Sequence, residues 1–170
     1  MSGKSDVAMV TFLETQSCLC RKFGVAYTAM LATKLTVEVV QAEVARFWSA
    51  FTSKSVDAVE DFYAQESTVF GTTSSRPEPG RLAAIRRQRE YFHPQTTLRV
   101  QTSPVEVYML GEFAAIATYT FQFHASRAKI GVEKSSEEHV IHGRATQIFA
   151  VDTDDRPRIF HEHLSVIHKV

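Results

Sequence analysis

The sequence predicts an α+β domain in which a curved, mostly antiparallel sheet wraps around three helices. Two observations carry this prediction. Helical periodicity dominates the first half of the chain up to about residue 92, and strand-like alternation dominates the remainder. The 170 residues are 44% hydrophobic and 22% charged, which is a globular composition and enough chain for one domain with a buried core.

Two helices are predicted first. Thr36 is a suitable N-cap, and apolar residues then recur at three- and four-residue steps as far as Thr52. A second helix begins near Ser55 and carries its apolar face as far as Tyr63. A short strand over residues 68–70 follows this pair of helices.

A polar connection and a third helix come next. Residues 72–80 are rich in Ser, Pro and Gly and indicate a loop. Residues 81–92 indicate a helix with Leu82 and Ile85 on its inner side, and Pro94 ends it. The arginines of this helix indicate a solvated outer face.

Four long strands are then predicted, separated by turns. The first contains Pro104, which indicates a bulge or an edge position because proline cannot donate to a sheet ladder. The second is rather apolar on both faces at first, as in a central strand. The strands span residues 97–109, 113–124, 139–151 and 158–168.

Residues 1–34 are predicted as an N-terminal helical extension and residues 35–170 as the domain. The extension has an imperfect helical stripe, and a partly ordered leader is the alternative. Cys18 and Cys20 lie too close together to close a useful loop and are interpreted as reduced thiols. With no clear signal peptide, we expect a cytoplasmic protein.

The charge balance restricts the partners. Lys plus Arg and Asp plus Glu both number 19, and the sequence lacks an apolar run long enough to span a bilayer. We therefore expect neither a nucleic-acid partner nor a membrane partner. Because no phosphate-binding loop or other cofactor motif is present, no cofactor is predicted.

The closing strand has an unusual polar row. By the two-residue period of a strand, His161, His163 and Ser165 share one face, whereas Glu162 and Leu164 share the other. Such a row needs hydrogen-bonding partners or a ligand.

A metal site is one alternative for the two histidines. His161 and His163 could bind a metal together with His142 or His124. Because the sequence reveals no third ligand in a suitable place, we predict no metal.

Several segments resemble the SnoaL-like domains of the nuclear-transport-factor-2-like superfamily. The resemblance covers residues 36 to 168 and extends to the association domain of calcium/calmodulin-dependent kinase II. It rests on the following segments: Arg46-Phe47-Trp48-Ser49-Ala50-Phe51, Asp61-Phe62-Tyr63-Ala64, Gly80, Gly111-Glu112-Phe113-Ala114, Arg144-Ala145-Thr146 and His161-Glu162-His163-Leu164-Ser165.

The resemblance implies a cone-shaped fold with a pocket between the helices and the concave sheet face. It also implies that the histidines of the closing strand face this pocket, and their polar row is alternatively a structural hydrogen-bond network. We favour histidines inward because the opposite face, which includes Phe160 and Leu164, would suit burial against a partner subunit. The predicted catalytic residues are His161 and His163, and the predicted ligand-binding residues are Arg144, Tyr63, Trp48, Phe47 and Ser165.

Two functions are compatible with these residues. The first is a small-molecule-binding domain, with a lyase, isomerase or cyclase acting on a carbonyl or carboxylate ligand as the candidate enzymes. The alternative is a non-catalytic homo-oligomeric association or ligand-sensing module. The sequence does not decide whether the domain is an enzyme. Long strands that are apolar on both faces exceed what three helices can cover, so we expect a homodimer through the sheet.

Overall fold

The fold was determined as a computed structural model, which describes residues 33–72, 74–128 and 136–167. The predicted helical extension lies outside the described residues apart from its last two. The helices are α2 (Val37–Thr52), α3 (Val56–Glu60) and α4 (Arg81–Gln88), which continues as the 3-10 turn η1 (Arg89–Tyr91). The strands are β1 (Tyr63–Phe70), β2 (Glu78–Pro79), β3 (Thr96–Thr102), β4 (Glu106–Met109), β5 (Ala114–Ala128), β6 (Ser136–Val151) and β7 (Pro157–Val166).

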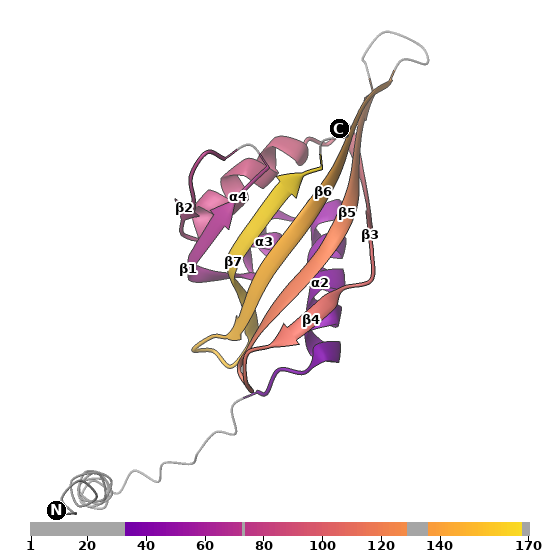
Figure 1. Ribbon diagram of the computed structural model, residues 1–170. Coiled ribbons are helices and arrows are strands. Elements are labelled where there is room, and N and C mark those ends of the chain that lie inside the picture. Colours follow the sequence, from indigo (N-terminus) through magenta and orange to yellow (C-terminus); the bar gives the residue numbers. More distant parts are fainter. Residues whose placement is uncertain (1–32, 73, 129–135, 168–170) are drawn as a thin grey trace, which may run out of the picture. The chain divides into compact units, whose positions relative to one another are not determined.

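The helices of the described chain cover one face of a single sheet (Figure 1). The strand order is β2-β1-β7-β6-β5-β3, with β4 also paired to β5. All pairs are antiparallel except β1 with β7, which are parallel. The sheet is therefore mixed, curved and unclosed, and the predicted α+β class is confirmed.

Two N-caps fix the first two helices, one at the predicted Thr36 and one at Ser55, where the second helix was expected to begin. The Thr36 hydroxyl accepts a hydrogen bond from the Val39 amide, and the Ser55 hydroxyl accepts one from the Ala58 amide. The second helix is shorter than predicted. Tyr63 belongs to β1 instead, because the parallel pairing with β7 extends this strand.

Proline divides the first predicted long strand. β3 ends before Pro104 and β4 begins after it, and both pair with β5. Proline lacks the N–H that a continuous ladder would need, so the break at this position follows from its chemistry.

The core lies between the concave sheet face and the helices. From α2 it takes Val40, Val44, Phe47, Trp48 and Phe51, and from β5 it takes Ala115, Ala117, Tyr119, Phe121 and Phe123. Ile85 of α4 is buried as predicted, but Leu82 is 66% exposed, so its predicted inward position is wrong. The helix α4 therefore contacts the core mainly through residues in its middle and at its end.

Candidate functional site

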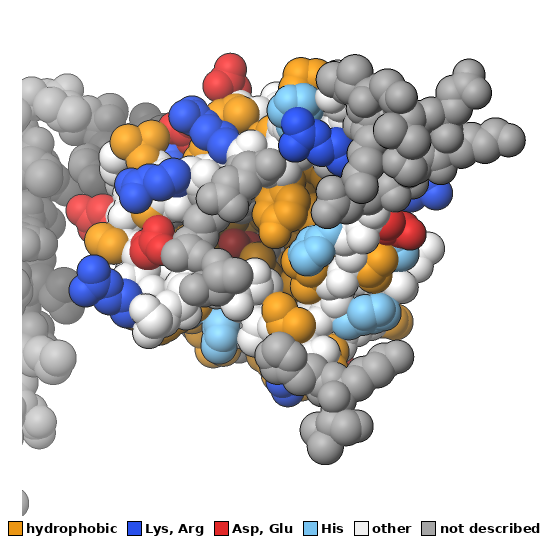
Figure 2. All heavy atoms as spheres, turned by 90° about the horizontal axis from the view of Figure 1, so that it is seen from above, with side chains coloured by type: hydrophobic (Ala, Val, Ile, Leu, Met, Phe, Trp, Pro, Cys, Tyr) orange, Lys and Arg blue, Asp and Glu red, His pale blue; other side chains and the backbone are white. Residues whose placement is uncertain are grey.

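A cavity of about 430 Å³ lies between the helices and the concave face of the sheet. Seen from above in Figure 2, this end of the domain is hollowed near its middle, with hydrophobic side chains around the hollow. Six aromatic residues line the cavity: Phe47, Trp48, Phe51, Tyr91, Phe121 and Phe123. Ile141, Leu164, Gly71, Thr72, Glu78, Arg86 and Gln88 complete the lining.

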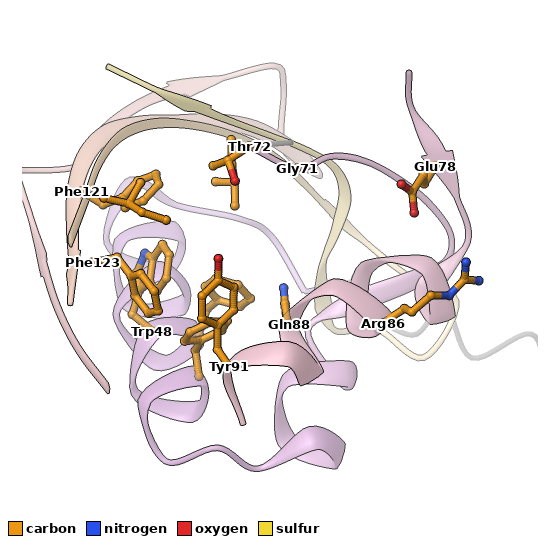
Figure 3. A pocket seen from close by; sticks show the side chains of 13 residues that line it. Trp48, Gly71, Thr72, Glu78, Arg86, Gln88, Tyr91, Phe121 and Phe123 are labelled. Carbon is orange, nitrogen blue, oxygen red and sulfur yellow. The ribbon is translucent and has the colours of Figure 1, made fainter. Parts of the chain in front are cut away.

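The aromatic side chains form a packed wall. The ring centroids of Trp48 and Phe121 are 5.4 Å apart, and those of Tyr91 and Phe123 are 5.0 Å apart. In Figure 3 these four side chains stand together on one side of the cavity, with Gln88 facing them from α4. Edge and tilted packing of this kind holds the rings in place, so the wall is preformed.

A buried hydrogen-bond network lies behind this wall, and both of its arms end at Glu162. In one arm Trp48 Nε1 donates to the Tyr119 hydroxyl (3.0 Å), which donates to Gln147 Oε1 (3.1 Å). Gln147 Nε2 then donates to Glu162 Oε1 over 2.8 Å. Three side chains, one each from α2, β5 and β6, are thereby linked to one carboxyl group.

The second arm reaches Glu162 from α4. Gln88 Nε2 donates to the Tyr63 hydroxyl over 2.7 Å, and that hydroxyl donates to Glu162 Oε2 over 2.8 Å. Tyr63 and Glu162 are almost completely buried. Gln88 also lines the cavity, so this arm connects the cavity surface to the carboxyl group.

Burial determines the ionisation of the network. Desolvation raises the pKa of Glu162 above its ordinary 4.5, while the hydrogen bonds from Gln147 and Tyr63 oppose the rise. Burial first, and then the charge of Glu162, raises the pKa of Tyr63 and of Tyr119 well above 10.0. Both phenols therefore keep their protons near neutral pH and remain hydrogen-bond donors.

The predicted inward orientation of the histidines is wrong. The register shifts on β7, because Phe149 pairs with Ile159 whereas Ile148 pairs with His161. Phe160 is the extra residue of a β-bulge, and a bulge reverses the face of every later side chain. The inner position next to Gln147 is consequently held by Glu162.

The outer face carries the polar row instead. His161 Nδ1 lies 2.7 Å from Thr68 Oγ1, and the ring of His163 lies 5.5 Å from that of Phe70. Ser165 pairs with Arg144 on the same outer face. The roles predicted for these residues stay predictions, but their side chains do not line the aromatic cavity.

Of the other predicted ligand-binding residues, two line the cavity and one does not. Phe47 and Trp48 line it, and Tyr63 lies behind it with its hydroxyl on Gln88. Arg144 instead lines a shallow groove on the outer face together with Ser and Thr side chains. The sequence therefore identified one wall of the cavity and misplaced the other.

The comparisons with known proteins decide the family. Residues 40–169 match the family model described as SnoaL-like domain. The chain belongs to the SnoaL-like domain family. No curated protein sequence matches it.

Solved structures show the same fold at low sequence identity. A candidate dehydratase of the nuclear-transport-factor-2-like family from Streptomyces avermitilis is 14% identical, with a TM-score of 0.68 over 78% of this chain and 97% of that one. A candidate calcium/calmodulin-dependent protein kinase II association domain from Xanthomonas campestris is 17% identical, with a TM-score of 0.63 over 77% and 87%. A candidate scytalone dehydratase from Novosphingobium aromaticivorans is 10% identical, with a TM-score of 0.62 over 77% and 83%.

Three polar residues of the site in this SnoaL-like domain were not predicted from the sequence. Gln88 follows a run of arginines in α4, Gln147 interrupts an apolar strand, and Glu162 lies between two histidines. The available signal was Gln147, because an amide on the inner face of a central strand needs a polar partner on the next strand. The bulge at Phe160 then places that partner at residue 162.

Among the described residues, no three His, Cys, Asp or Glu side chains are grouped as a metal ion would require. None of the helices described has the length and apolar character to cross a membrane.

Proposed function

We propose that this SnoaL-like domain binds a small, largely apolar molecule in the aromatic cavity. The observation that supports the proposal is the cavity itself, since about 430 Å³ of space lined by six aromatic side chains falls within the size range of small-molecule sites. Rigid aromatic walls favour flat ligands, because ring faces and edges pack best against other rings.

Binding fits this cavity better than the Arg–His chemistry considered from the sequence. Among the described residues that line it, only Glu78 and Arg86 are charged. Glu162 has a raised pKa, but it lies behind Tyr63 and Gln147 and is about 1% exposed. A general base must come within hydrogen-bond reach of the proton it removes. A lyase, isomerase or cyclase reaction driven by the histidines would therefore act outside this cavity.

The test is a binding titration with a matched pair of variants. Trp48 is the only tryptophan of the chain and lines the cavity, so its fluorescence reports occupancy by 2-methoxynaphthalene. Ile141→Phe fills the cavity and should weaken binding by at least about tenfold, or about 1.4 kcal/mol. Val140→Phe makes a similar change at the neighbouring exposed position and should leave the affinity unchanged. Equal affinities in both variants would refute the cavity as the site.

A second candidate function is self-association through the outer sheet face. Tyr108, Ile116 and Ile148 lie opposite one another on β4, β5 and β6, and Tyr108 is 57% exposed. The described helices all lie on the other face of the sheet (Figure 1). An apolar row of this kind favours a homodimer in which each copy covers the other.

Sedimentation or light scattering measures this association directly. The wild-type domain should give a dimer mass at micromolar concentration, and Ile148→Glu should give a monomer because it places a charge in the centre of the row. Thr120→Glu changes an exposed residue of the same face outside the row and serves as the control. A monomer mass for the wild type would exclude the dimer.

A further inference from the structure

Thr72 places an uncharged hydroxyl group at the wall of the aromatic cavity. The residue follows β1 and Gly71, is half-buried and lines the cavity. In Figure 3 its side chain points from the end of β1 into the cavity, toward Tyr91 and beside the aromatic wall. Thr72 makes no hydrogen bond with any other described residue, so its hydroxyl can serve a ligand. Few polar groups in a largely apolar cavity usually decide how a ligand is oriented.

Two hydrogen bonds between Gly71 and Ser74 restrain the chain next to Thr72. The Gly71 N–H donates to Ser74 Oγ over 3.0 Å, and the Ser74 N–H donates to the Gly71 carbonyl oxygen, also over 3.0 Å. The preceding strand β1 is paired on both sides, with β2 and with β7. The Thr72 side chain is therefore presented from a restrained backbone, which lowers the entropy cost of a ligand contact.

The amide and indole groups of the cavity wall are already committed to the buried network. Gln88 Nε2 donates to the Tyr63 hydroxyl, and Gln88 Oε1 is buried. Trp48 Nε1 donates to the Tyr119 hydroxyl. Neither side chain therefore has a polar atom to offer a ligand without breaking a hydrogen bond of the protein.

The charged side chains of the cavity lie away from its rings. In Figure 3 Glu78 and Arg86 lie together on the far side of Gln88 from the aromatic side chains. A charged ligand group beside Thr72 would lose hydration without gaining an ion partner there, which is costly. A neutral oxygen acceptor, in contrast, needs only one donor. The surroundings of Thr72 therefore favour a carbonyl oxygen over a carboxylate.

We propose that Thr72 recognises the polar group of the ligand, its hydroxyl donating a hydrogen bond to a neutral oxygen acceptor at the edge of a flat aromatic molecule. This inference rests on the proposed ligand-binding function and specifies its ligand class. The aromatic wall supplies most of the affinity through ring packing, and the hydroxyl selects the substituent at the edge of the ligand. Ser74 is a positioning residue that acts through its hydrogen bond to Gly71.

Calorimetric titration with two isosteric probes measures this hydrogen bond. 2-Acetylnaphthalene and 2-isopropenylnaphthalene have the same outline, but only the ketone has an oxygen acceptor. Thr72→Val keeps the side-chain shape without the hydroxyl, so the ratio of ketone affinity to alkene affinity should fall about tenfold, equal to about 1.4 kcal/mol. Thr72→Ser keeps the hydroxyl and should keep most of the ratio. Thr97→Val makes the same change at an exposed position of β3 and should leave the ratio unchanged.

A second pair of variants tests the positioning role of Ser74. Ser74→Ala removes the acceptor of the Gly71 N–H, so the affinity ratio should fall about threefold because Thr72 is less restrained. Ser75→Ala changes the exposed neighbouring residue and should leave the ratio at its wild-type value. Near-ultraviolet circular dichroism checks that each variant is folded, and Thr72→Ala carries the test if Thr72→Val is unfolded.

The outcomes separate the two proposals. If neither probe binds to the wild type, the cavity is not a site for aromatic ligands and the proposed function fails. If both probes bind but Thr72→Val keeps the wild-type ratio, the cavity function stands and the role of Thr72 is overturned. If the ratio falls in Thr72→Val but stays unchanged in Ser74→Ala, Thr72 recognises the ligand and the positioning role of Ser74 is overturned.

Discussion

Glu162 and His163 are neighbours on β7, yet they occupy opposite environments. Glu162 is 1% exposed and accepts hydrogen bonds from Tyr63 and Gln147, whereas His163 is exposed and packs beside Phe70. The difference shows that the polarity of a side chain did not select its face. The bulge at Phe160 set the register, and the inner face supplied the donors that a buried carboxyl needs.

Truncation of Glu162 and truncation of His163 should differ most strongly in their effects on the free energy of unfolding. Glu162→Ala leaves the Tyr63 hydroxyl and the Gln147 amide without their acceptor, and each such group costs about 1–3 kcal/mol. We expect a loss of about 3 kcal/mol in the free energy of unfolding, measured by urea denaturation. His163→Ala should change it by no more than about 0.5 kcal/mol. Similar losses in both variants would contradict the assigned register.

The next largest difference in stability is expected between two alanine substitutions on β6, Gly143→Ala and His142→Ala. A Cβ at Gly143 would lie 2.2 Å from Cζ of Phe121, which faces it across the strand pair. Gly143→Ala should therefore cost about 2 kcal/mol through overpacking, and it should also displace a wall of the cavity. Adding Phe121→Leu should recover part of this loss. Thermal and urea unfolding measure both effects. His142→Ala, on the exposed side of β6, should be nearly neutral in these measurements.

The pH dependence of stability should have opposite signs for two carboxyls. The folded-state pKa of Glu162 is raised above 4.5, so its ionisation destabilises the fold as pH rises through the window above 4.5. Hydrogen bonding by Arg156 lowers the pKa of Asp61 below 3.8, so its contribution is present above 3.8 and is lost as pH falls.

Urea unfolding between pH 3 and pH 8 checks both signs. The stability of the wild type relative to Glu162→Gln should fall as pH rises. Its stability relative to Asp61→Asn should rise as pH increases through the acid range, by a small amount because this ion pair is half exposed. Parallel slopes for the two comparisons would contradict the burial of Glu162.

The smallest expected loss of stability concerns the hydrogen bond between β7 and β1 on the outer face. His161 Nδ1 and Thr68 Oγ1 are 2.7 Å apart at half-buried positions. His161→Ala should cost about 1 kcal/mol, the usual contribution of one hydrogen bond. In a double-mutant cycle with Thr68→Val the two losses should not add, and full additivity would show that the bond contributes nothing.

The sequence sufficed for most of the fold because its signals were local. Thr36 and Ser55 cap helices through their own hydroxyls, and Pro104 breaks a strand through its own missing N–H. Tyr119 and Phe121 share one face of β5 by the two-residue period of a strand, and both are buried. In each case the chemistry of the residue itself determines the local structure.

The candidate site was less predictable because its signals are not local. The extra residue at Phe160 is defined only by pairing with β6, and one residue of slip places Glu162 rather than His161 opposite Gln147 on the inner face. Gln88 joins the buried network only through its hydrogen bond to Tyr63, which is 25 residues earlier in the chain. The short strand predicted for residues 68–70 began earlier than expected for the same reason, since its pairing partner is β7.

The position of β7 has a consequence for biosynthesis. β7 lies between β1 and β6 in the sheet, although it follows every other described strand in the chain. During translation β1 must wait for its parallel neighbour until more than eighty further residues have left the ribosome, since Phe70 and Pro157 are this far apart. The edge of β1 lacks this neighbour in the meantime, and pairing between strands so far apart in the chain is expected to be a slow step of folding.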